Sequence, residues 1–291
     1  MTPEAIFQTH RPRLRRLAYQ MLGSVADAED VVQDTWLRWN GAQQADIADP
    51  LAWLVRVATR LTLDRLRAAR ACREAYVGPW LPEPLIENLE DPVEWAETVS
   101  VAFLLALQRL SPLERAVFLL RDVFDQDYAA IAASLSRDEA ACRQLASRAR
   151  AHVKAARQRF SPPPEQAGRL VAAFLDAAAR NDPVALGALL AEDCMLISDG
   201  GGKRAAALRP MVGREDVLRL FRGLASRQGH AFDLTAVRKA RINGLPGFVL
   251  SEASGLTTFV FEPDEAGAIS AIYIVRNPEK LSRLTFAALD L

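Results

Sequence analysis

The spacing of apolar residues changes at Ser161-Pro-Pro-Pro164, and this change limits the folds open to the chain more than any other feature. Before this segment, apolar residues recur every three or four positions, which is typical of amphipathic helices. After it, helical stretches are joined by segments in which apolar and polar residues alternate, which is typical of strands. Consecutive prolines form a stiff linker. The sequence therefore predicts an all-α part, a linker and an α+β part.

The helical part ends in a short helix, a turn and a long basic helix, predicted between Tyr128 and Phe160. The second helix carries an apolar stripe on one face and basic residues on the other. Such a helix fits the major groove of DNA, where Arg pairs with guanine and Gln with adenine. A plain helical hairpin with a solvated basic face is the alternative. The residues expected in the groove are Arg137, Glu139, Arg143, Gln144, Ser147 and Arg148.

Charge is unevenly distributed, although the net charge of the 291 residues is +0. Arginines are concentrated at 56–73 and again at 137–159, and the segment from Glu83 to Glu97 between them contains no Lys or Arg. Two DNA contacts separated by an acidic connector would explain this pattern, and two solvated helix faces are the alternative.

The first part of the chain contains further helical segments, at Ile6–Leu22, Asp27–Trp39 and from Leu51 to about Arg73. Three prolines and one glycine then enforce an extended connector at Tyr76–Pro84. A second helical set begins near Pro92. The sequence thus predicts five parts: 1–75, a Pro-rich acidic connector at 76–92, 93–160, the linker at 161–164, and 165–291.

The α+β part begins with helices and continues with alternating segments. Helices are predicted at Glu165–Arg180, Pro183–Leu190 and Gly213–Arg227, and strands at Phe232–Val237, Gly247–Glu252, Leu256–Phe261 and Ala268–Val275. We expect one antiparallel sheet with helices packed on it.

The helical segments resemble a known family in their order along the chain. Asp27–Arg38 resembles conserved region two of an extracytoplasmic-function RNA polymerase sigma factor, Trp53–Arg67 the promoter-reading helix that follows it, and Leu110–Arg150 region four. The resemblance implies a multi-domain fold with two all-α sigma domains, the second with a helix-turn-helix. It also implies promoter DNA and core RNA polymerase as partners.

The remaining segments resemble one group within that family. The tail is similar to the SnoaL-like, ketosteroid-isomerase-like cone, an α+β fold with a curved antiparallel sheet and helices. Tyr76–Pro84, Asp199–Lys203 and Asn277–Leu281 look like signature segments of the sigma factors that carry this extension. The implied regulatory contact, between the tail and the sigma regions or connector, involves Asp199, Gly200, Gly201, Gly202, Lys203, Asn277, Pro278, Lys280 and Leu281.

Two further surfaces follow from the resemblance together with the helix faces. The polymerase-binding face is expected at Asp27, Asp30, Gln33, Asp34 and Arg38, some of which could instead only complement the helix dipole. The downstream promoter element is expected to meet Arg56, Arg60, Asp64 and Arg67. Arg60 stands where many family members have asparagine. Trp53 could stack on an unpaired base or belong to the core.

The tail allows three interpretations. As a regulator acting in cis, it would use the three glycines for close approach, with Lys203 or Arg204 facing Glu83 or Glu87. As a sensor, the cone would bind a small molecule. As an isomerase, cyclase or hydrolase, it would draw on Asp193, Asp199, Asp233 or His230, but these form no spaced acid-base pair. We therefore expect no enzymatic activity.

Other features exclude whole classes of protein. The three cysteines and three histidines are scattered, which predicts neither a metal site nor a disulfide framework, and no cofactor motif is found. Asp199–Lys203 lacks the spacing of a phosphate loop. No apolar run reaches membrane-spanning length and no signal peptide is recognisable, so we expect a cytoplasmic protein without membrane contact.

Overall fold

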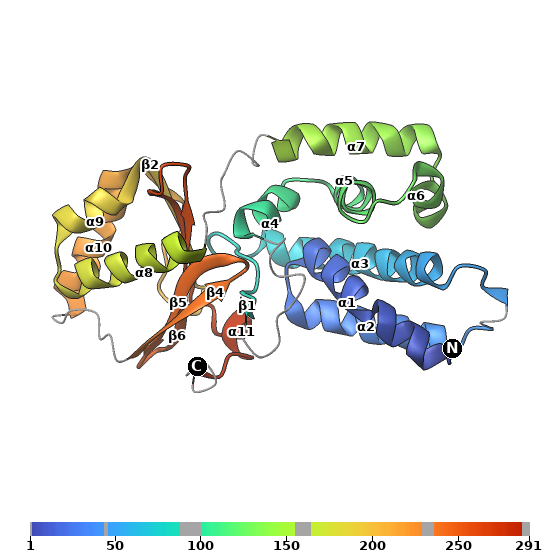
Figure 1. Cartoon of the computed structure of the whole chain (residues 1–291), viewed down its shortest axis with the longest axis horizontal. Helices are drawn as coiled ribbons and strands as arrows, with labels where there is room; N and C mark the ends of the chain where they lie inside the picture. The colour runs from blue at the N-terminus through green and yellow to red at the C-terminus, as the bar shows by residue number, and fades with distance from the viewer. Residues whose placement is uncertain (1, 44–45, 88–99, 155–163, 229–235, 287–291) are drawn as a thin grey trace. The chain divides into compact units, whose positions relative to one another are not determined.

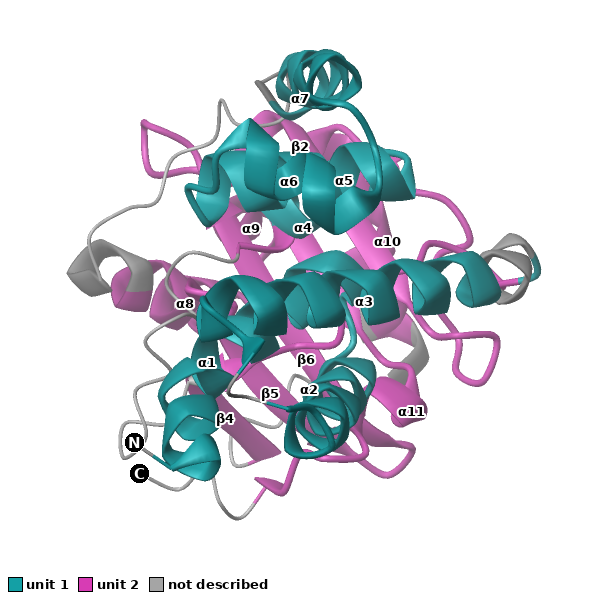
Figure 2. Cartoon of the chain, turned by 90° about the vertical axis from the view of Figure 1, so that its right-hand side faces the viewer, with its two compact units in different colours: residues 1–75, 102–157 teal, residues 76–101, 158–291 magenta. Residues whose placement is uncertain are grey.

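The computed structural model describes residues 2–43, 46–87, 100–154, 164–228 and 236–286. The chain forms two compact units, shown in teal and magenta in Figure 2. The helical unit comprises Met1–Ala75 and Ala102–Arg157, and the sheet unit comprises Tyr76–Val101 and Gln158–Leu291. The connector that separates the two helical parts in the sequence therefore belongs to the unit that contains the sheet.

The first two helices of the helical unit begin and end at capping residues. Ser24 caps α2 by accepting a hydrogen bond from the Asp27 N–H, and Gly23 ends α1 in the left-handed conformation with φ of 70°. Trp39 is fully buried and its ring packs on Trp53, with centroids 5.4 Å apart. The helices are α1 (Pro3–Leu22), α2 (Val25–Asn40) and α3 (Pro50–Glu74).

The second helical part contains the predicted helix-turn-helix. Ser111 and Glu114 form a capping box at the start of α5, and Asp127 caps α6. The stripe of α7 is buried at Cys142, Leu145, Ala149 and Val153 as predicted, while Ala156 and Phe160 lie outside the described residues. The elements are α4 (Val101–Gln108), α5 (Pro112–Phe118), the π-helix η3 (Leu119–Val123), α6 (Tyr128–Leu135) and α7 (Glu139–Lys154).

The two helical parts pack on each other within this unit, with α3 against α5 and α6 (Figure 1). Arginines make polar contacts across this boundary to carbonyls at or near helix ends. Arg115 is buried and donates to the Met21 carbonyl at 2.5 Å. Arg13 donates to the Phe124 carbonyl at 2.7 Å. Carbonyls in the last turn of a helix lack partners within it, so an arginine can satisfy them.

The sheet unit is built on seven strands in the order β1-β4-β5-β6-β7-β2-β3. Neighbouring strands are antiparallel except β2 and β7, which are parallel, so the expectation of a purely antiparallel sheet is corrected at one pair. The strands are β1 (Ile86–Glu87), β2 (Leu190–Asp199), β3 (Met211–Val212), β4 (Val237–Ile242), β5 (Leu245–Glu252), β6 (Gly255–Pro263) and β7 (Ile269–Val275).

Four of these strands differ from the sequence prediction, because the short strands β1 and β3 were also not predicted. The prediction missed β2, because Glu192 and Asp193 interrupt its alternation and an apolar run follows them. The strand expected at Phe232–Val237 falls largely on residues 229–235, outside the described part, and β4 begins at Val237.

Helices formed by residues 164–179, 183–189 and 214–228 pack on the sheet (Figure 1). Aromatic side chains contribute to the core between the helices and the sheet. The ring centroids of Phe174 and Phe261 are 4.6 Å apart, and the rings of Phe248 and Phe259 stack with centroids 4.6 Å apart. The helices of the unit are α8 (Pro164–Ala179), α9 (Pro183–Leu189), α10 (Arg214–Gln228) and the short α11 (Pro278–Leu281). Within the described ranges, none of the chain's helices combines the length and apolar character that a membrane span requires.

Candidate functional site

The predicted groove residues lie on the solvent side of α7 and of the turn before it. Asp138 fixes the start of this helix by accepting a hydrogen bond from the Ala141 N–H at 2.7 Å. Because the apolar stripe is buried in the helical unit, the opposite face is open to solvent. Glu139 is half-buried, and the exposed members of the set are Arg137, Arg143, Gln144, Ser147 and Arg148.

The arginines of α7 have acidic partners that sequence reasoning missed. Arg148 pairs with Glu114 at 3.1 Å, and Arg150 with Asp122 at 2.8 Å. Burial acts to raise the pKa of Glu114, but hydrogen bonds from Ser111 and the charge of Arg148 outweigh it and lower the pKa overall. Both acids come from the preceding helices, α5 and η3, so nothing local in α7 signals them. Any phosphate that binds Arg148 or Arg150 would compete with these pairs.

On α3, the residues expected at the downstream promoter element are partly engaged. Arg67 pairs with Asp64 at 3.0 Å, and Arg56 is half-buried. Arg60 is exposed, and its guanidinium donates to the Ser134 carbonyl at 3.1 Å and to the Ser136 hydroxyl at 3.3 Å. Arg60 therefore contacts the turn of the helix-turn-helix. Trp53 packs on Trp39, which favours the core interpretation over base stacking.

The acidic face of α2 is exposed at Asp27, Asp30, Gln33 and Arg38 and half-buried at Asp34. Arg65 of α3 reaches Asp30 at 3.1 Å and Asp34 at 2.9 Å. Burial acts to lower the pKa of Arg65, but these two hydrogen bonds outweigh it and raise the pKa. Arg65 lies in the arginine-rich segment 56–73, for which the sequence suggests a DNA contact, whereas in the structure it partly neutralises the acidic face of α2.

An apolar side chain interrupts this acidic face. Leu37 of α2 is 60% exposed, and it follows Gln33 and Asp34 by four and three positions, so it lies on the same face. A helix face that carries both acidic and apolar side chains is suited to bind a partner helix that carries both basic and apolar side chains. Sequence reasoning missed Leu37, although its place on the exposed face could have been read from the helical spacing.

In the sheet unit, the three signature segments meet at one buried carboxylate. Asp199 ends β2 and is fully buried. Its side chain accepts hydrogen bonds from the Tyr76 hydroxyl at 2.6 Å and from the Leu81 N–H at 2.8 Å, both in the connector. It also accepts hydrogen bonds from two groups of its own domain, the Lys280 ammonium at 2.7 Å and the Gly201 N–H at 3.0 Å. We name the assembly of Asp199, Lys280, Asn277, Tyr76, Trp80 and Leu81 the Asp199 clasp.

Lys280 is the cation of the clasp, and only 11% of its side chain is exposed. Its ammonium lies 3.9 Å from the centroid of the Trp80 ring and also donates to the Leu81 carbonyl. Asn277 caps α11 and donates its side-chain N–H to the Tyr76 hydroxyl at 2.8 Å. Burial, and then the hydrogen bond to Asp199, raise the pKa of Tyr76. The clasp therefore holds a charge pair together with its polar partners.

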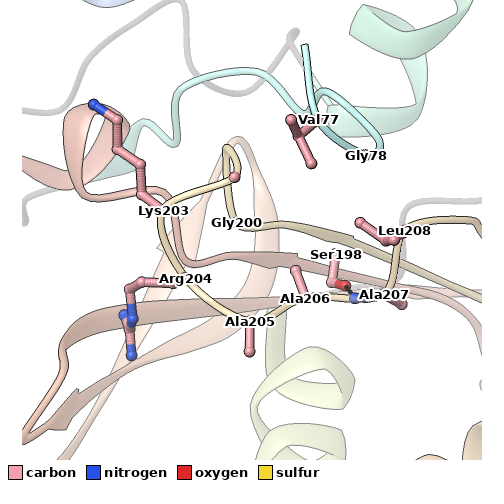
Figure 3. Close-up of a pocket in the computed structure, with 11 residues that line it drawn as sticks. Val77, Gly78, Ser198, Gly200, Lys203, Arg204, Ala205, Ala206, Ala207 and Leu208 are labelled. Carbon is pink, nitrogen blue, oxygen red and sulfur yellow. Dashed lines mark hydrogen bonds between the residues drawn. The ribbon is translucent and has the colours of Figure 1, made fainter.

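The glycine loop approaches its neighbours too closely for side chains. A Cβ atom on Gly201, whose φ is 61°, would lie 2.3 Å from the Asn277 amide nitrogen. One on Gly202 would lie 3.2 Å from Val77 of the connector. Val77 and Gly78 of the connector and residues of the loop together line a pocket of about 380 Å³, which Figure 3 shows. These glycines therefore allow the close approach for which we had predicted them.

Downstream of the glycines, the basic partners differ from the expectation. Lys203 pairs with Glu279 of α11, and Arg204 pairs with Glu252 of β5 at 2.7 Å. Figure 3 shows the two side chains leaving the loop in different directions. The expected pairing with Glu83 is therefore wrong, and the side chain of Glu87 lies outside the described residues. Burial acts to raise the pKa of Glu252, but the Thr257 hydrogen bond and two arginines lower it overall.

The remaining predicted residues of the tail do not converge on one place. Pro278 is the first residue of α11 and exposed, and Leu281 is buried. Asp193 is exposed near the start of β2. His230 and Asp233 lie outside the described residues. The carboxylate of Asp199 is already occupied by four donors, which leaves it poorly placed to act as a catalytic base.

Comparisons with known proteins agree with this arrangement. Residues 6–72 match the family model described as Sigma-70 region 2, and residues 100–153 match the model described as Sigma-70, region 4. A curated extracytoplasmic-function (ECF) RNA polymerase sigma factor of Mycobacterium tuberculosis is 38% identical over 95% of this chain and 92% of its own. The chain therefore belongs to the ECF sigma factors, which act in transcription initiation.

That relative is SigJ, and its crystal structure is similar over nearly the whole chain. The TM-score is 0.79 at 34% identity, covering 95% of this chain and 97% of SigJ. The probable ECF sigma factor SigI of M. tuberculosis is 34% identical over 61% of this chain and 63% of its own length. The similarity to SigJ extends over the C-terminal α+β domain, so the predicted family and fold class are both confirmed.

Proposed function

We propose that this chain directs core RNA polymerase to promoters and that its C-terminal α+β domain restrains that activity by holding the connector. The observation that carries the proposal is the Asp199 clasp, in which one buried carboxylate binds the connector twice, at Tyr76 and Leu81. Transcription initiation would place the protein in the cytoplasm, beside the chromosome.

A second group of contacts extends the hold along the connector. The Leu85 N–H donates to the side chain of Asn243 at 3.1 Å, and the Asn243 N–H donates back to the Leu85 carbonyl at 2.8 Å. Ile86 then pairs with Ile242 as β1 joins the sheet edge. Both ends of the segment 76–87 are thus bound to one domain. Released and extended, these residues could span about 40 Å.

This hold matters because the connector is the covalent link between region 2 and region 4. The helical unit keeps the two regions packed, with Arg60 of α3 on the turn of the helix-turn-helix. A short tether raises the effective concentration of one region near the other. Holding the connector therefore favours the packed form, in which Arg60 of the expected downstream contact is engaged with the turn of the helix-turn-helix, and releasing it favours separation on polymerase and DNA.

The roles of the exposed faces follow from the same proposal. The acidic face of α2 with Leu37 would bind the polymerase, α3 would meet the downstream element, and α7 the upstream one. A small-molecule ligand is the second candidate partner, and the pocket beside Val77 and Gly78 favours it. Because connector residues line this pocket, a ligand bound there would contact the held segment.

Run-off transcription with core polymerase on genomic fragments tests the proposal. Lys280→Met removes the cation of the clasp and keeps an apolar stem of similar length. Lys239→Met, at an exposed position on β4, is the matched control. We expect Lys280→Met to raise promoter-dependent transcription severalfold at limiting polymerase, because it frees the connector. Unchanged or reduced transcription from a folded Lys280→Met protein would contradict the restraint.

A further inference from the structure

Tyr128, the first residue of α6, gathers three arginines of region 4 around one side chain. The guanidinium carbons of Arg121 and Arg143 lie 5.3 and 5.2 Å from its ring centroid. The Arg150 guanidinium lies 3.5 Å from its hydroxyl. Tyr128 is half-buried, and its backbone is fixed because Asp127 caps the helix. A rigid ring at this place can hold long, flexible side chains in defined positions.

Of these three arginines, Arg143 is the one that lies where a recognition helix meets base edges. It is exposed near the start of α7, the part of a recognition helix that meets base edges. Glu139 binds one of its terminal nitrogens at 2.5 Å, and the Tyr128 ring lies against its guanidinium. Arg121, by contrast, also donates to the Gln126 carbonyl within its own loop. A planar guanidinium held before binding loses less entropy when it pairs with a base.

We propose that Tyr128 is a positioning residue for promoter specificity: its ring holds Arg143 ready to read a guanine in the upstream element. Arg pairs with the O6 and N7 atoms of guanine through two nitrogens of one plane, so the orientation of that plane decides whether both bonds form. Tyr128 itself need not touch a base. The inference rests on the proposed promoter-directed function and names a determinant of its specificity.

A ring that only packs α6 would predict different behaviour. Tyr128→Leu keeps apolar bulk at the half-buried site but removes the negative face that attracts cations. Tyr128→Phe keeps the face and removes only the hydroxyl near Arg150. A packing role makes Leu and Phe alike, whereas a positioning role separates them.

The test is selection of bound sequences from a library of promoter fragments randomised at the upstream element. The full chain is used with core polymerase, as wild type and as Tyr128→Leu, Tyr128→Phe, Arg143→Ala and the double variant Tyr128→Leu/Arg143→Ala. Arg143→Ala identifies the base position that Arg143 reads. At that position we expect Tyr128→Leu to reduce the preference for guanine by about two- to fivefold, from the usual strength of an exposed cation–π contact. Tyr128→Phe should keep the preference, and the double variant should lose no more than Arg143→Ala alone.

Three results would overturn the inference. Tyr128→Leu could keep the full preference at that position, it could weaken binding equally for all sequences, or Tyr128→Phe could lose as much as Leu. Melting temperatures of the variants separate a folding defect from a loss of specificity. A wild-type protein that enriches no sequence with core polymerase would reject the proposed function itself, and the inference with it. Enrichment with unchanged preference in Tyr128→Leu rejects only the inference.

Discussion

The contact between region 2 and region 4 and the contact between the C-terminal domain and the connector are made by different kinds of groups. In the helical unit, three arginines link region 2 to region 4 by donating hydrogen bonds to backbone carbonyls and to one serine hydroxyl. They are Arg13, Arg60 and Arg115. In the sheet unit, the fully buried Asp199 pairs with Lys280 and binds the connector. The first contact joins charges to neutral acceptors, partly at the surface, and the second encloses a charge pair.

This difference sets how easily each contact opens. When region 2 leaves region 4, Arg60 and its acceptors regain hydrogen bonds to water, so the net change is small. When the connector leaves, Asp199 and Lys280 lose partners while they remain close to a largely apolar interior. The Asp199–Lys280 pair stays intact, but its hydrogen bonds to the connector are made by buried charges, and such bonds are stronger than those of an exposed arginine. The Arg60 contact is therefore suited to open readily, whereas the connector is suited to be held.

The largest expected effect tests the buried side of this comparison. Asp199→Ala leaves Lys280 buried without its carboxylate and should lower the free energy of unfolding of the sheet unit by about 3–5 kcal/mol. Asp193→Ala, at an exposed position on the same strand, is the control and should change it little. Chemical denaturation followed by circular dichroism measures both. Equal losses in the two variants would mean that the clasp does not stabilise the domain.

The glycine loop offers the next largest effect. Gly201→Ala combines a left-handed backbone angle with a Cβ atom 2.3 Å from Asn277 and should cost about 2 kcal/mol. Gly267→Ala shares a positive φ, 85°, but its Cβ atom would meet nothing within 4 Å, so it should cost about 1 kcal/mol. The difference between their unfolding free energies isolates the close approach. A difference of zero would show that the loop moves away without cost.

A smaller effect depends on pH. Burial and the Asp199 hydrogen bond raise the pKa of Tyr76 above its usual value of about 10. The folded state thus favours the neutral phenol, and this stability is present below about pH 10 and lost as the pH rises further. Tyr76→Phe should remove that part of the alkaline decline in stability and cost about 1 kcal/mol at neutral pH. An unchanged decline in Tyr76→Phe, measured by denaturation from pH 8 to 11, would contradict the assignment.

The smallest expected effect concerns the exposed contact. Arg60→Ala should weaken the packing of region 2 on region 4 by about 1 kcal/mol or less, and Arg67→Ala, on the same helix but bound to Asp64, should not. Distances between spin labels at the exposed Glu4 and Ala140 report the packing. For Arg60→Ala we expect a broader distribution of label-to-label distances, shifted to longer values. The same distribution in both variants would show that Arg60 does not hold the regions together.

Local patterns predicted the parts of the fold that depend on one segment at a time. Helical spacing predicted α7 and its buried stripe, and alternation predicted β5, β6 and β7. The strand β2 was missed because Glu192 and Asp193 break its alternation, although pairing with β7 still holds it in the sheet. Segments whose burial comes from distant neighbours do not show that burial in their own sequence.

The same reasoning explains what was missed at the sites. The signature segments predicted a contact between the tail and the connector, but not its chemistry, because Tyr76 and Asp199 are 123 positions apart. The expectation placed Lys203 or Arg204 opposite Glu83 or Glu87, whereas Glu279 is the acid that pairs with Lys203 in the fold. The link from Arg65 to the acidic face of α2 likewise depends on how two helices pack. Ion pairs between separate elements are set by tertiary structure.

The most direct test of the central claim is hydrogen exchange at the connector amides, above all Leu81, in the free chain and bound to core polymerase. If the α+β domain holds the connector and polymerase binding releases it, the Leu81 amide should exchange slowly in the free chain and much faster in the complex. Asp199→Asn should speed exchange in the free chain, while Asp193→Asn should not. Fast exchange in the free wild-type chain, or protection that polymerase leaves unchanged, would contradict the account.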